Sequence, residues 1–197
     1  MPLNIDWAFI ARQEGAAITE GYVPRANDGT VAGQSGVTIA TGFDLGQHDR
    51  AYLDRVLSGH ADIIRLLAPY LGLKRSRAVA ALAATPLTIT DAQAQIIDRA
   101  IKTDKANALA PIYDNAVTVL RKPALLRFTA LPREAQTVIM SVAFQYGNLP
   151  TRTPRFWRIV VRQDWQAAVA ELRAFGDAYG QRRQREARYL SALLVTN

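Results

Sequence analysis

Apolar residues recur along most of the chain at the three- and four-residue spacing of amphipathic helices, almost without interruption after residue 49. A first helix is predicted over about residues 6–15, where Trp7, Ile10 and Ala11 share one face. Glu14 continues that apolar face at the end of the helix. The chain therefore begins with a short helix whose last turn carries a carboxyl group.

A different pattern follows this helix. The chain from 16 to 46 is rich in glycine, asparagine, aspartate and threonine, which favours turns, and it ends in a β-like run over residues 37–44. Because side chains alternate between the two faces of a strand, Thr38 and Asp44 take the same face. Fully extended, they would lie about 20 Å apart. They can share a site only if the chain bends between them, and Gly42 permits such a bend.

Together these patterns predict an α+β, mostly helical fold in a single domain over residues 1–197. A small β/turn lobe over about residues 16–46 would precede a large helical lobe over about residues 47–197, and we expect a cleft between them. In the helical lobe, the longest pattern begins at Thr90-Asp91, and Pro111 would interrupt or kink that helix.

Glu14 is the first candidate catalytic residue. A carboxyl group that continues an apolar stripe loses water, which favours its protonated form, and a general acid needs that form near neutral pH. The structural alternative is that Glu14 turns into solvent or pairs with Arg12 or Arg25. For Thr38 and Asp44, the structural alternative is a strand former and an N-cap of the next helix.

At this point the sequence resembles a known family. The pair Glu14-Gly15 and the run over residues 35–47 are similar to the muramidase domain of pesticin and its toxin and phage relatives, which are related to phage-type lysozymes. Weaker similarity continues in the same order along nearly the whole chain, at residues 141–148, at Asp164-Trp165 and at residues 182–186. The resemblance implies a lysozyme-like fold with a small β-hairpin lobe, a larger helical lobe and the active site between them.

The resemblance also implies an activity, which is hydrolysis of the β-1,4 bond between N-acetylmuramic acid and N-acetylglucosamine in peptidoglycan, without a cofactor. The pesticin-like catalytic set transfers to Glu14, Thr38 and Asp44. Glu14 would protonate the glycosidic oxygen, and Asp44 with Thr38 would position and activate a water on the opposite face, inverting the anomeric centre. In phage-type lysozymes the aspartate precedes the threonine, so Asp28 is the alternative to Asp44.

Two departures from the phage-type pattern favour the pesticin-like branch. Ala40 stands where phage-type lysozymes usually have glycine, and Phe43 stands near their histidine.

After Pro132, an apolar stripe of Ala135, Val138, Ile139, Val142 and Ala143 predicts the central helix of the helical lobe. Substrate-lining residues are expected at the turn that ends this helix. By resemblance these are Gln145, Tyr146 and Gly147. The alternative is an ordinary helix C-cap at Gly147.

The amino-acid composition limits the kinds of catalytic or metal site that are expected. The chain has no cysteine and only two histidines, His48 and His60, so neither a thiol nucleophile nor a metal site is expected. The net charge is +7. Between residues 152 and 188, nine arginines stand against four acidic residues, which favours anionic surfaces such as the cell wall.

The start of the chain lacks the basic region and apolar core of a signal peptide, and no stretch is long enough to span a membrane. We therefore expect a protein made in the cytoplasm without a signal peptide. It would act in the periplasm or on the cell wall after holin-type release or secretion, as a phage endolysin or a bacterial toxin. The expected partner is the peptidoglycan glycan strand, with no nucleic acid and no membrane insertion. The expected state is a monomer, and an immunity protein is a further candidate partner.

Two other functions stay open. One is an inactive relative that kept the fold and binds the wall or a partner. The other is a basic nucleic-acid-binding module, supported by Phe156, Trp157 and Tyr189 among the arginines. A murein-lysis assay separates the first from an enzyme, and a salt-sensitive gel shift would support the second.

Overall fold

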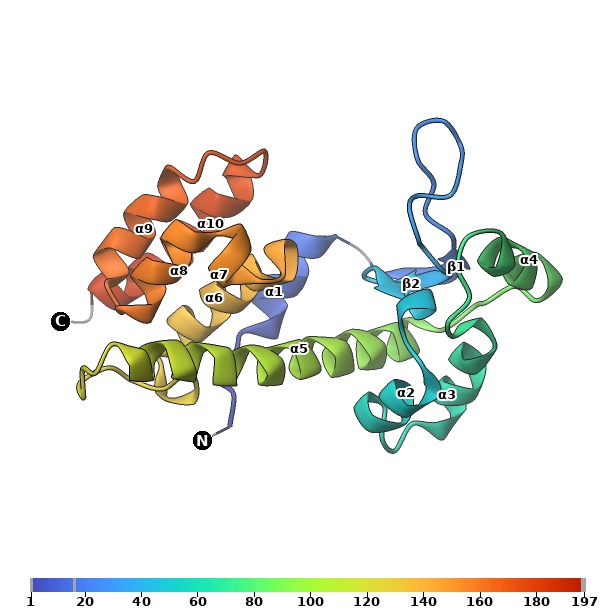
Figure 1. Ribbon diagram of the computed structural model, residues 1–197, viewed down its shortest axis with the longest axis horizontal. Coiled ribbons are helices and arrows are strands. Elements are labelled where there is room, and N and C mark those ends of the chain that lie inside the picture. Colours follow the sequence, from blue (N-terminus) through green and yellow to red (C-terminus); the bar gives the residue numbers. More distant parts are fainter. Residues whose placement is uncertain (1, 16, 196–197) are drawn as a thin grey trace. The chain divides into compact units, whose positions relative to one another are not determined.

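The computed structural model describes residues 2–15 and 17–195 as a mostly helical chain with a three-stranded antiparallel sheet (Figure 1). The predicted α+β, mostly helical fold class is confirmed. The predicted ranges extend to residues 1, 16, 196 and 197, which lie outside the described part of the chain.

The chain divides into two compact units, each with its own hydrophobic core. Unit 1 comprises Met1–Gln13 and Ala106–Asn197, and unit 2 comprises Glu14–Lys105. Residues 47–105 thus belong to the same unit as the sheet. The single catalytic domain over residues 1–197, with its cleft, stays a prediction.

Unit 2 contains the sheet, in the order β1-β2-β3, built from β1 (Ile18–Tyr22), β2 (Thr38–Ala40) and β3 (Phe43–Asp44). The β-like run is therefore not one strand, as the alternation predicted, but a tight hairpin of two antiparallel strands. The chain reverses around Ala40 and Gly42, whose φ angles are +54° and +89°. The bend that Gly42 was expected to permit is present, because glycine adopts positive φ without steric cost.

The helices of unit 2 cover a core of buried aliphatic and aromatic side chains that includes Val37, Ile39 and Phe43 of the hairpin region. Helix α2 is capped by Asp49, whose side chain accepts a hydrogen bond from the Tyr52 N–H. The helical elements of this unit, in chain order, are η1 (Leu45–Gln47), α2 (Arg50–Val56), α3 (Ala61–Leu67), η2 (Ala68–Tyr70), α4 (Ser76–Ala84) and the first part of α5 (Asp91–Val119).

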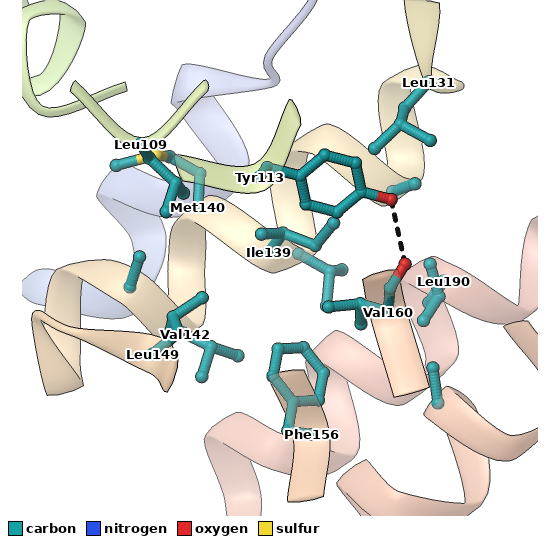
Figure 2. Close-up of a cluster of buried hydrophobic side chains, with 14 of the residues drawn as sticks. Leu109, Tyr113, Leu131, Ile139, Met140, Val142, Leu149, Phe156, Val160 and Leu190 are labelled. Atoms are coloured by element: carbon teal, nitrogen blue, oxygen red, sulfur yellow. Dashed lines mark hydrogen bonds between the residues drawn. The ribbon is translucent and has the colours of Figure 1, made fainter. Parts of the chain in front are cut away.

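Unit 1 is helical. Its elements are α1 (Trp7–Glu14) up to Gln13, α5 from Ala106 onward, η3 (Phe128–Ala130), α6 (Arg133–Tyr146), α7 (Leu149–Arg152), α8 (Pro154–Val161), α9 (Trp165–Arg173), α10 (Gly180–Ser191) and η4 (Ala192–Leu194). Helix α6 is the central helix that its apolar stripe predicted, and nine of its consecutive residues from Ala135 to Ala143 are buried. Figure 2 shows part of this core, in which the Tyr113 hydroxyl donates a 2.9 Å hydrogen bond to the Val160 carbonyl.

Two helix details bear on the sequence predictions. Asp6 caps α1, because its Oδ1 accepts a hydrogen bond from the Phe9 N–H at 2.8 Å. Helix α5 continues through Pro111 instead of ending there. The interruption that the sequence allowed at Pro111 does not occur, and the alternative, a kink, stays a prediction.

Candidate active site

Glu14 ends α1 and opens unit 2. Its Oε2 lies 2.8 Å from Nζ of Lys102 on α5. The two side chains are only 16% and 8% exposed, so this is a shielded ion pair. The structure therefore gives Glu14 a partner that is neither of the arginines suggested as structural alternatives.

Thr38 and Asp44 are direct partners across the hairpin, in the antiparallel register of β2 and β3. The hairpin thus brings these two candidates together, although they are six positions apart in the sequence. Thr38 is 3% exposed, and its hydroxyl donates a weak 3.4 Å hydrogen bond to the Gly36 carbonyl.

The Asp44 carboxylate is held at one oxygen and less constrained at the other. Oδ1 accepts hydrogen bonds from the backbone N–H groups of Gly36 at 3.0 Å and Gly46 at 2.9 Å. Oδ2 accepts one from Nε2 of Gln47 at 3.2 Å. Asp44 is therefore an N-cap, but of the short η1 helix. The sequence did not single out Gln47, although its position three residues after Asp44 is a capping distance.

The backbone around Asp44 is packed too tightly for side chains. A Cβ atom on Gly36 would lie 2.5 Å from Cα of Gly46 and 2.6 Å from the Leu73 carbonyl oxygen. One on Gly46 would lie 2.5 Å from the same oxygen. These neighbours are backbone atoms, which cannot swing aside.

Gly36→Ala is accordingly expected to lower the free energy of unfolding by about 3 kcal/mol, the upper end of the usual cost of overpacking. The added methyl group must separate the Gly36 and Gly46 backbones, which also breaks the hydrogen bonds to Asp44. Urea unfolding followed by circular dichroism measures the change. Gly180→Ala is the matched control, because a Cβ there meets nothing within 4 Å, and an unchanged midpoint for Gly36→Ala would contradict the argument.

One face of α5 connects Glu14 to the hairpin. Asp98, Lys102 and Lys105 are spaced at i, i+4 and i+7, so they share a face of the helix. Oδ1 of Asp98 accepts hydrogen bonds from the Thr41 N–H at 3.1 Å and the Thr41 hydroxyl at 2.5 Å. Successive turns of α5 thus hold the tip of the hairpin and the carboxylate of Glu14.

Several charged groups around this face of α5 influence the pKa values of Lys105 and His48. Burial lowers the pKa of Lys105, against the opposing effect of the Glu14 charge. Burial also lowers the pKa of His48, where Asp44 acts in the raising direction and Lys105 in the lowering direction. Glu14, Lys105, His48 and Asp44 therefore belong to one electrostatic neighbourhood within unit 2.

Aromatic rings pack beside Asp44. His48 stacks on Tyr52 with ring centroids 4.1 Å apart, and Phe43 lies 5.0 Å from His48. Phe43 thus packs against a histidine of this chain.

Asp28 lies elsewhere in unit 2, in an exposed turn. Its Oδ1 accepts hydrogen bonds from the Thr30 hydroxyl at 2.6 Å and the Thr30 N–H at 2.9 Å. These two hydrogen bonds lower the pKa of the Asp28 carboxyl. Asp28 therefore makes the local contacts of a turn residue.

The three predicted substrate-lining residues are at the C-terminus of α6, in unit 1. Gln145 accepts a hydrogen bond from the guanidinium of Arg183 through its Oε1, and the Tyr146 hydroxyl donates one to Asp177 Oδ2 at 2.5 Å. Gly147 is the C-cap of α6, with φ of +71°. The structure thus shows internal contacts for all three, and their binding of substrate stays a prediction.

The arginine-rich region contains buried and exposed members. Arg183 is 1% exposed and forms ion pairs with Asp177 and with Glu186, which is itself fully buried. By contrast, an exposed basic groove on α1 and α10 is lined by Phe9, Arg12, Gln13, Arg185, Arg188 and Tyr189. Only part of the positive charge is therefore available to an anionic surface.

Two of the three aromatic residues that suggested nucleic-acid binding are buried, since Phe156 and Trp157 are 1% and 8% exposed. Tyr189 packs on Phe9 with ring centroids 4.3 Å apart and also lines the basic groove. Because bases stack on exposed rings, Phe156 and Trp157 no longer support the nucleic-acid interpretation. No helix in the described parts of the chain has the length and hydropathy needed to span a membrane.

A mostly helical chain with a small antiparallel sheet, and a shielded glutamate at the end of its first helix, defines a lysozyme-like protein. The chain belongs to the Pesticin family, described as a bacterial toxin homologue of phage lysozyme, C-terminal part, and the match covers residues 4–166. The predicted family and lysozyme-like fold are thus confirmed. A comparison with curated proteins found no match. Family membership indicates a glycoside hydrolase of the muramidase type acting on peptidoglycan.

Proposed function

We propose that this protein hydrolyses the β-1,4 bond between N-acetylmuramic acid and N-acetylglucosamine in bacterial peptidoglycan. The observation that carries the proposal is the placement of Glu14, Thr38 and Asp44 in unit 2. One face of α5 contacts Glu14 through Lys102, and it contacts the hairpin that carries Thr38 and Asp44 through the hydrogen bonds between Asp98 and Thr41. They are also the residues that match the catalytic set of the pesticin-like branch.

In the proposed mechanism, Glu14 donates its proton to the glycosidic oxygen as the sugar acquires oxocarbenium character. Asp44 accepts a proton from the attacking water, and Thr38 helps to position that water. Oδ2 of Asp44 is the oxygen suited to this role, because Oδ1 already accepts two backbone hydrogen bonds. Attack from the face opposite the leaving group inverts the anomeric centre, and no cofactor takes part.

The proposed place of action is the periplasm or the cell wall, after holin-type release or secretion, in a toxin or endolysin context. The exposed guanidinium groups of Arg12, Arg185 and Arg188 support adsorption to an anionic wall. A monomeric state and an immunity protein stay predictions.

The products of murein digestion test the proposal. The purified protein is expected to release muropeptides that end in reducing muramic acid, identified by mass spectrometry. Reducing glucosamine ends would indicate a glucosaminidase, and release of free peptides an amidase. No release by a folded protein would favour an inactive wall-binding relative. Proton NMR of fresh products should show the α-anomer first if the reaction inverts.

A further inference from the structure

The ion pair between Glu14 and Lys102 is largely shielded from solvent. The side chains are 16% and 8% exposed, and Nζ lies 2.8 Å from Oε2. Taking two charges out of water is costly, so a pair of this kind needs close geometry to persist. Exposed ion pairs, by contrast, hold their side chains only weakly.

The surroundings of the pair add a second positive charge. Lys105 lies on the same face of α5, one turn after Lys102, and its charge interacts with Glu14, Lys102 and His48. On the preceding turn, Asp98 is engaged with Thr41. Arg12, on α1 itself, is two positions before Glu14 and therefore points to another side of the helix. The Glu14 carboxylate thus contacts Lys102, and Lys105 adds a second positive charge on the same face of α5.

We propose that Lys102 is a positioning residue for the reaction, which fixes the orientation of the Glu14 carboxyl group and sets the upper pH limit of activity. This inference rests on the proposed role of Glu14 as the general acid. Lys102 needs no contact with substrate for this role, because it acts through Glu14.

The effect of Lys102 on the reaction depends on whether the Glu14 carboxyl group is protonated. A nearby positive charge favours the ionised form of a carboxyl group. Glu14 must be protonated before it can protonate the glycosidic oxygen, so Lys102 reduces the fraction of competent enzyme as the pH rises. Once the proton has moved to the leaving group, Lys102 stabilises the carboxylate that remains. Removing the charge of Lys102 is therefore expected to change the pH dependence of the reaction.

Lys102→Met tests this inference through the pH dependence of murein hydrolysis. The alkaline limb of the rate profile is expected to move to higher pH by about one unit, the lower end of the effect of a close opposite charge. On the acidic plateau the variant should be slower than wild type, because the carboxyl group is less well oriented. The ratio of variant to wild-type rate should therefore rise with pH.

The controls separate positioning from stability. Lys122→Met removes the same charge from an exposed site and should leave the alkaline limb in place. Lys102→Arg keeps the charge and should do the same. If Lys102→Met does not fold, Lys102→Gln replaces it, since the amide can still contact Glu14 without a charge. A folded neutral variant whose rate falls equally at every pH would overturn the inference.

A readout without substrate separates this inference from the proposed function. In protein labelled with carbon-13 glutamate, the Glu14 carboxyl signal should change position in Lys102→Gln, because the contact with the lysine charge is lost. If wild type releases no muramic acid ends, the proposed function fails, and with it the positioning role of Lys102 in the reaction. If wild type is active and neither the carboxyl signal nor the rate profile shifts, only the inference fails.

Discussion

Glu14→Gln is expected to lower the rate of murein hydrolysis by about 100-fold or more, the usual contribution of a general acid. Glutamine keeps the size of the side chain, and its Oε1 can still accept a hydrogen bond from Lys102. It has no acidic proton for the glycosidic oxygen, so the leaving group would depart as an alkoxide. Clearing of purified murein measures the rate.

The matched control for this variant is Glu20→Gln, which changes an exposed glutamate of the same unit. Circular dichroism and thermal unfolding should show that both variants are folded. Some loss of stability is expected for Glu14→Gln alone, because it leaves the buried Lys102 without its anion. A folded Glu14→Gln protein that clears murein at the wild-type rate would remove Glu14 from the mechanism.

Asp44→Asn should also lose most of the activity, whereas Asp28→Asn should keep most of it. The two substitutions are well matched, because each asparagine retains a carbonyl Oδ1. At position 44 that oxygen can still accept from Gly36 and Gly46, and at position 28 it can still accept from Thr30. Only the second oxygen is lost, which at position 44 is the proposed acceptor of a proton from water.

Murein clearing by both variants, with circular dichroism as the check on folding, decides between them. The opposite result, with Asp28→Asn inactive and Asp44→Asn active, would assign the second carboxylate as in phage-type lysozymes. Equal activity of both variants would show that neither aspartate activates the water.

The helical part of the fold was largely predictable, because hydrophobic spacing decides which face of a long helix is buried. The buried stripe of α6 follows its sequence pattern directly. Short elements were harder. In α1 the structure buries Phe9 and Ile10 and leaves Ala11 exposed. Eight residues hold too few apolar positions to fix a face by spacing alone, and the contact of Phe9 with Tyr189 comes from a helix at the far end of the chain.

The hairpin shows a second limit. The bend that Gly42 permits was correctly predicted, but the run is a hairpin and not one strand. The residue type of Ala40 did not indicate that its φ would be positive as well. A position where related proteins usually have glycine was the available signal. The positive φ at Ala40 indicates that the hairpin keeps this backbone conformation although alanine, unlike glycine, disfavours it.

For the candidate site, the sequence singled out residues by kind and family position, and it missed the residues that hold them. Lys102 and Asp98 do not belong to the apolar pattern of α5, so hydrophobic spacing did not indicate them. Their spacing with Lys105 was the usable signal. Conversely, the partners of Gln145 and Tyr146 could not be foreseen, because Arg183 and Asp177 lie more than 30 positions away along the chain.

The close approach of Gly36, Gly46 and the Leu73 carbonyl has a consequence for mutational scanning. In a selection for lysis, substitutions at positions 36 and 46 would be tolerated as poorly as substitutions at positions 14 and 44. Neither glycine, however, has a side chain that could contact a substrate. A parallel selection for protein abundance would separate the two kinds of position. Variants at the glycines would be depleted in both selections, whereas conservative variants at the two acids would be depleted mainly in the lysis selection. Sequence invariance around this hairpin is therefore a poor guide to chemistry until abundance has been measured.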